Sequence, residues 1–164
     1  MTGGGDATLY QFDADRKLMK IVRPDGSSID FGYDASFRLS SVIHASGTLG
    51  YRYDTSGRLA EADAPGEALD YAWDGPLLTS VTWSGALGGK LGYTWNNDFM
   101  LASTSVNGAN PVSYGYDTDG LLTTVGAMTI TRDPNTGLLS ATQLGVVREA
   151  ITRNEFGEVA TYTA

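Results

Sequence analysis

The stretch YRYDTSGRL at residues 51–59 decides how this chain folds. Variants of it recur about every twenty residues, and a fixed period of this kind indicates one structural unit stacked on itself. Each copy has an aromatic residue, one spacer, a second aromatic residue, then Asp or Asn, and a few residues later a Leu. Residues that resemble a site in one copy are therefore expected to be scaffold where they recur in all of them.

Two sets of recurring residues define the repeat. We expect the first set to pack as a structural aromatic ladder and the second to close turns. The ladder comprises Tyr10, Phe12, Phe31, Tyr33, Tyr51, Tyr53, Tyr71, Trp73, Tyr93, Trp95, Tyr114 and Tyr116. The turn residues are Asp13, Asp34, Asp54, Asp74, Asn96, Asp117, Asp133 and Asn154. The last two copies are degenerate, with Ile130 and Arg132, then Ile151 and Arg153, in place of the rings.

One copy reads as a β-hairpin. Leu49, Tyr51 and Tyr53 occupy alternate positions, so one face of an extended strand carries three large apolar groups. Asp54 can accept backbone amides two residues on, and Gly57 supplies the left-handed conformation that closes a turn. A single hairpin buries too little to stand alone, so neighbouring copies must share their edges.

One spacing does not fit a plain hairpin. Leu39 and Val42 are three residues apart, as are the corresponding pairs in other copies, and a regular strand would send them to opposite faces. Either a β-bulge returns both to one face, or both faces of the sheet are covered. We favour the bulge.

Composition narrows the class of protein. The 164 residues fit one domain or one block of repeats, and the 21 glycines and 10% aromatics point away from helix. There is no cysteine, and 11 basic against 19 acidic residues give a formal charge of −8, which disfavours nucleic acid as a partner. No apolar run is long enough to span a bilayer, and no signal peptide is visible. The fold class expected is all-β: tandem hairpins in a curved, spiralling antiparallel strip.

The sequence at residues 51–59 closely resembles the tyrosine-aspartate (YD) repeat of Rhs proteins, bacterial toxin-complex shells and teneurins. The likeness extends from about Leu9 to Tyr162. In that family the repeats form a spiralling β-sheet that closes into a hollow shell, which in bacteria encloses a toxic polypeptide and in animals belongs to cell-surface adhesion proteins. The resemblance implies a structural role, a secreted or cell-surface location, and toxin cargo as a possible partner.

The other groups of polar and aromatic residues indicate structural rather than catalytic or metal-binding roles. Calcium needs six to eight converging oxygens, whereas each copy offers one or two turn carboxylates. His44 is the only histidine and no nucleophile motif accompanies it, so we assign no catalytic, cofactor-binding or metal-binding residue and no enzyme activity. Trp83 lies outside the paired positions, which makes it the best candidate for an exposed ring that contacts a glycan. A glycan- or cell-surface-binding module is therefore the alternative function.

Residues 1–8 read as a leader, natural or introduced by cloning, and residues 9–164 as a block of about eight repeats. Unpaired strand edges template association, so the partners expected are neighbouring repeats of a longer chain or a second copy joined through sheet edges. We expect the edge near Leu9 to be adhesive and the polar last copies to form a partial cap.

Overall fold

The computed structural model describes residues 7–164, and the part of the predicted leader at residues 1–6 lies outside them. In this part of the chain every element is a β-strand, and within each of its two units neighbouring strands run antiparallel. The all-β hairpin fold expected from the sequence is confirmed. No helix in the described residues is long and apolar enough to cross a membrane.

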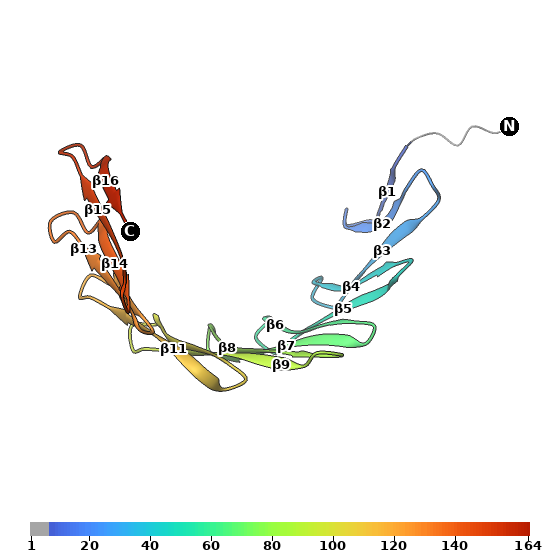
Figure 1. Cartoon of the computed structure of the whole chain (residues 1–164). Coiled ribbons are helices and arrows are strands. Elements are labelled where there is room, and N and C mark those ends of the chain that lie inside the picture. The colour runs from blue at the N-terminus through green and yellow to red at the C-terminus, as the bar shows by residue number, and fades with distance from the viewer. Residues whose placement is uncertain (1–6) are drawn as a thin grey trace. The chain divides into compact units, whose positions relative to one another are not determined.

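The strands fall into two compact units, divided after Lys90. Within each unit they follow one another in sequence order, so every connection is local (Figure 1). The first unit contains β1 (Leu9–Phe12), β2 (Leu18–Val22), β3 (Ser28–Tyr33), β4 (Leu39–His44), β5 (Gly47–Tyr53), β6 (Leu59–Ala64), β7 (Glu67–Asp74) and β8 (Leu77–Ser84).

The second unit takes in most of β9 (Gly89–Trp95), which begins just before the division. It continues through β10 (Leu101–Val106), β11 (Ala109–Tyr116), β12 (Leu122–Val125), β13 (Met128–Arg132), β14 (Leu139–Leu144), β15 (Val147–Arg153) and β16 (Val159–Thr163). One repeat is thus a pair of strands: the first carries the two ring positions and the second begins at the Leu.

The register places apolar and polar residues on opposite faces of each unit. Residues directly opposite each other in an antiparallel pair share a face. Tyr51 lies opposite Ala62, which lies opposite Leu69, whereas Arg52 lies opposite Glu61. We call the first set of positions the apolar face and the second the polar face.

A β-bulge interrupts the hairpin at the same place in each of the eight described repeats. In the second repeat Gly32 pairs with Ser41 and Tyr33 with Leu39, so Ser40 is the extra residue. Because of it, both Leu39 and Val42 lie on the apolar face, and the predicted bulge is confirmed. The extra residues are Met19, Ser40, Ala60, Thr79, Ala102, Thr123, Ser140 and Ala160.

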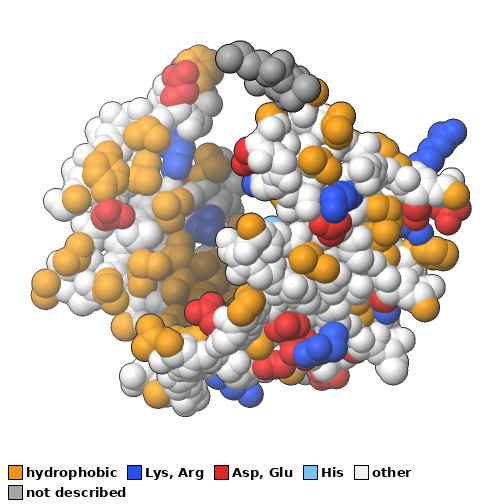
Figure 2. Space-filling model, turned by 90° about the vertical axis from the view of Figure 1, so that its right-hand side faces the viewer, with side chains coloured by type: hydrophobic (Ala, Val, Ile, Leu, Met, Phe, Trp, Pro, Cys, Tyr) orange, Lys and Arg blue, Asp and Glu red, His pale blue; other side chains and the backbone are white. Residues whose placement is uncertain are grey.

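Each unit is a single layer of sheet without an enclosed core. Among the described residues no hydrophobic side chain is buried, and Ser80, at 5% exposure, is the one buried polar residue. Hydrophobic side chains consequently remain visible at the surface (Figure 2). The fold is therefore held by contacts along the sheet, from one strand to the next, rather than by packing between layers.

Directly across neighbouring strands, the ring positions alternate with smaller side chains. Phe31 lies opposite Val42, which lies opposite Leu49, so aliphatic side chains stand next to this ring across the strands. The physical reason is that the paired ring positions lie on the first strand of each repeat, whereas the second strands carry only Trp83 and Tyr162. Rings of successive repeats are therefore two strands, about 9–10 Å, apart.

Candidate functional site: the contacts between successive repeats

The second ring of a repeat reaches back to the repeat before it. The Tyr53 hydroxyl donates a hydrogen bond of 2.9 Å to the carbonyl oxygen of Leu39, the residue at which the preceding bulge begins. The Trp73 indole Nε1–H donates in the same way to Leu59, also at 2.9 Å. We call this bond the latch, and the side chain that makes it the latch donor.

The same bond recurs in both units. Tyr33 donates to the Leu18 carbonyl and Tyr116 to the Leu101 carbonyl, each at 2.9 Å. The bulge explains why these carbonyls are free to accept, because the extra residue locally disrupts the backbone ladder. A ring position that looked like simple packing is therefore also a hydrogen-bond position.

The two degenerate repeats retain the latch with a different donor. Arg132 donates through Nε to the Leu122 carbonyl at 3.3 Å, and Arg153 donates through Nη1 to the Leu139 carbonyl. Both arginines are half-buried at the position that a ring occupies elsewhere. These copies have lost their aromatics but not their connection to the preceding repeat.

The turn that follows each latch donor is built around its Asp or Asn. The Asp54 Oδ1 atom accepts the backbone amides of Ser56 at 2.8 Å and Arg58 at 2.9 Å. Asp13, Asp34, Asn96, Asp117 and Asn154 accept the equivalent amides in their own turns. Asp133 accepts those of Asn135 and Thr136 in a turn with one more residue.

Asp74 is the exception among the predicted turn residues. Strand β7 extends through Asp74, which pairs with Leu77 across the two residues Gly75 and Pro76. Only four positions separate Asp74 from Leu78, one fewer than in the repeat at 51–59. The shorter connection leaves no room for the longer turn, so Asp74 ends a strand instead of organising a loop.

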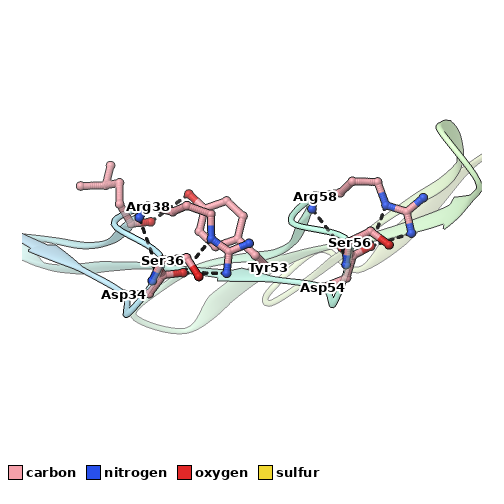
Figure 3. Close-up of polar contacts among 8 residues, drawn as sticks. Asp34, Ser36, Arg38, Tyr53, Asp54, Ser56 and Arg58 are labelled. Atoms are coloured by element: carbon pink, nitrogen blue, oxygen red, sulfur yellow. Dashed lines mark hydrogen bonds and ion pairs between the residues drawn. The ribbon is translucent and has the colours of Figure 1, made fainter.

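In the second and third repeats, an arginine connects the turn to the next latch donor; Figure 3 shows both arginines on their turn carboxylates, and Arg38 beside Tyr53. The Arg38 guanidinium binds the Asp34 carboxylate at 2.8 Å, and its Cζ lies 4.3 Å from the centre of the Tyr53 ring. Arg58 binds Asp54 at 2.7 Å and lies 5.6 Å from the Trp73 ring. A cation over a ring face is attracted by the ring quadrupole, so these arginines add to the hold between repeats.

The environment of the two turn carboxylates lowers their pKa. For Asp54 the main cause is the hydrogen bond from the Arg58 amide, with further contributions from the Arg58 guanidinium and the Ser56 amide. The pKa of Asp34 is lowered in the same way by Arg38 and Ser36. Both carboxyls are ionised and hydrogen-bonded within their turns, which makes them poor general acids.

The sequence did not reveal Arg38, Arg58, Arg132 or Arg153 as contact residues. A signal existed, because the second and third copies place Ser two residues and Arg four residues after Asp, and both degenerate copies carry Arg at the ring position. Recognising it required knowing that the bulge leaves the Leu carbonyl available.

The predicted glycan contact Trp83 lines a hollow on the apolar face of the first unit. The hollow has a volume of about 490 Å³ and is also lined by Tyr51, Leu49 and Leu87. Ala62 stands where the second repeat has Val42, and this smaller side chain leaves space between the strands. The Trp83 side chain is half-buried against Gly89, where a Cβ would lie 2.3 Å from its Cζ2 atom.

Two further candidates lie apart from the latch. His44 is half-buried at the end of β4, and its Nδ1 accepts the Ser46 amide at 3.1 Å. A polar hollow of about 470 Å³ in the second unit is lined by Asp117, Asp119 and Asp133 together with Arg132. Within residues 7–164, no group of three or more His, Cys, Asp or Glu side chains is placed to hold a metal ion.

The family model of the teneurin YD-shell matches residues 1–163. Among curated proteins no significant match exists.

Solved structures with the same fold come from toxin complexes. One is TcdB2-TccC3 without its hypervariable C-terminal region, with a TM-score of 0.75 and 13% identity over 90% of this chain. TcdB2-TccC3-TEV gives 0.71 and 14% over 88%, and the Photorhabdus luminescens Tc holotoxin pore gives 0.58 and 12% over 94%. This chain spans only about a tenth of the length of each of those chains.

Proposed function

Because the chain belongs to the teneurin YD-shell family, we propose that it is a structural segment of a YD-repeat shell. Its task is to form and stiffen a strip of sheet, with neighbouring repeats of a longer parent chain as its direct partners. By resemblance to the bacterial members, the completed shell encloses a toxin polypeptide. A secreted or cell-surface location accompanies that role.

The observation that carries this proposal is the latch. The side chains that recur most regularly, the second rings and the turn carboxylates, are engaged in contacts within a turn or between repeats. A catalytic site needs convergent groups that are free to act on a substrate. Here the recurrent groups are used for architecture, so we propose no enzymatic activity.

A deletion of one repeat tests the architectural role. Removing residues 45–64 joins His44 to the Pro65-Gly66 turn, so that His44 takes the place of Ala64 opposite Glu67. Because each repeat contacts only its neighbours, the shortened chain should fold with the same strand content by circular dichroism and unfold cooperatively.

The matched control removes residues 59–66, which deletes β6 and its connector and leaves half a repeat. This variant should lose much of its strand signal, because the alternation of ring strand and Leu strand is broken. If the whole-repeat deletion disrupts the fold as much as the half-repeat deletion does, the chain is not a modular strip and the shell role is wrong.

The second candidate function is glycan binding, which the hollow beside Trp83 favours. The Leu87 side chain is 85% exposed at its rim, and Tyr51 offers a second ring. Sugar rings bind to aromatic platforms of this kind. A glycan array probed with the chain and with Trp83→Ala decides the question: signals lost in the variant support glycan binding, and an array without signals rejects it.

A further inference from the structure

The outer edge of β16 presents the acceptor half of a latch. Arg153 pairs with Val159 across the last bulge, as Tyr33 pairs with Leu39 in the second repeat. By the same register, the Val159 carbonyl takes the acceptor position of the last repeat. Among the described residues β16 pairs with β15 alone, and all five of its residues are exposed. This edge therefore offers an acceptor that no described latch donor uses.

The outer edge of β1 lacks the donor half. Phe12 pairs with Leu18 across the first bulge, so it occupies the latch-donor position of its repeat. A phenyl ring has no hydroxyl, indole or guanidinium group with which to donate. The β1 edge of a second copy could extend the sheet at β16 by backbone pairing, but it could not form a latch.

The residue before the acceptor indicates which donor fits. Lys17, Arg38 and Arg58 precede the acceptor leucines of three repeats, and each lies over the ring of the next latch donor. Leu121 and Leu138 precede the acceptors that receive Arg132 and Arg153. Of the four ring latches described above, three have a cation before the acceptor and the fourth, that of Tyr116, has Met100; neither arginine latch has a cation there.

In the last repeat the equivalent residue is Glu158. Its carboxylate accepts a hydrogen bond of 2.8 Å from the Asn154 side-chain amide, which holds it beside the Val159 turn. A carboxylate at this position attracts a guanidinium. It gives a ring no cation to lie over its face.

We propose that the β16 edge is a docking edge whose occupant is a β-hairpin repeat with arginine at the latch-donor position. The proposal rests on the shell role, since it extends the contact between repeats to one more repeat. Phe12 makes a second copy of this chain a poor occupant, which disfavours head-to-tail association between the β1 edge of one copy and the β16 edge of another. It also revises the expectation that the end near Leu9 is the adhesive one and the last copies form the cap.

Self-association of point variants tests the proposal, because each copy carries both edges. Sedimentation equilibrium would compare the wild-type chain with Phe12→Tyr and Phe12→Arg, which add a neutral and a charged donor. Phe12 is 59% exposed, so both substitutions should be tolerated, and circular dichroism verifies this. We expect association to tighten by about two- to tenfold for Phe12→Tyr and by about tenfold or more for Phe12→Arg.

Glu158→Gln supplies the matched control for the choice of donor. The glutamine retains an oxygen for the Asn154 amide but carries no charge. Combined with Phe12→Arg it should remove most of the arginine advantage, while the Phe12→Tyr variant should be little affected. The proposal is wrong if the wild type, Phe12→Tyr and Phe12→Arg associate equally, or if none of the three associates. It is also wrong if Phe12→Arg still associates more tightly than the others when Glu158→Gln is present. None of these outcomes depends on the repeat-deletion result.

Discussion

Removing a single hydroxyl from the latch is the sharpest perturbation available. In Tyr116→Phe the ring stays, but the 2.9 Å bond to the Leu101 carbonyl is lost. A hydrogen bond contributes a net stabilisation of about 0.5–1.5 kcal/mol, and a buried acceptor left without a partner destabilises the fold by about 1–3 kcal/mol. Because Tyr116 is half-buried and water can reach the carbonyl in part, we expect a loss of about 1 kcal/mol in the free energy of unfolding.

The assay is urea unfolding followed by circular dichroism, with Tyr51→Phe as the matched control. The Tyr51 hydroxyl has no hydrogen-bond partner among the described residues, so its removal should change the free energy of unfolding by less than about 0.5 kcal/mol. Hydrogen exchange of the amides near Leu101 should accelerate in Tyr116→Phe alone. Equal losses in the two variants would refute the claim that the second ring position is a hydrogen-bond position.

The other predictions concern one donor, one turn and one carboxylate. Arg132→Tyr should unfold at the same urea concentration as the wild type or a higher one, because a ring donor replaces a guanidinium donor. Arg132→Met, which has no donor, should lose about 1 kcal/mol in the free energy of unfolding. Equal urea midpoints for the two variants would contradict the latch. Phe99→Gly should stabilise the chain by about 0.5–1 kcal/mol, since Phe99 has φ 60 and is 69% exposed; a lower melting temperature would oppose this. The pKa of Asp54 is lowered, so its contribution is present above its ordinary pKa of 3.8 and is lost as pH falls through the lower folded value. The urea midpoint should therefore fall on acidification below about pH 4, and less steeply in Asp54→Asn, because Asn96 makes the same turn with an amide; identical pH profiles would exclude Asp54 as a cause.

Local chemistry explains which features the sequence could predict. Asp54 followed by Gly57 specifies a turn through contacts four residues apart or fewer, and such turns form from local preferences alone. The spacing of Leu39 and Val42 is incompatible with a regular strand that has one apolar face, so it predicts the bulge. Both features are contained within one repeat.

Contacts between repeats were harder to predict, because they depend on where the neighbouring backbone points. The partner of Tyr53 is a backbone carbonyl 14 residues earlier, and a carbonyl has no sequence signature. Arg153 looked like the loss of a ring because its role as a donor becomes evident only beside the Leu139 carbonyl. Asp74 was grouped with the turn residues although a single missing residue changes the connection that follows it.

The exchange of hydroxyl protons, followed by nuclear magnetic resonance, tests the central claim most directly. If latches join the repeats, the hydroxyl protons of Tyr33, Tyr53 and Tyr116 should exchange slowly with water and show proximity to the preceding repeat. The hydroxyl protons of Tyr51 and Tyr71 should exchange too fast to observe. Uniformly fast exchange of all five hydroxyls would contradict the account.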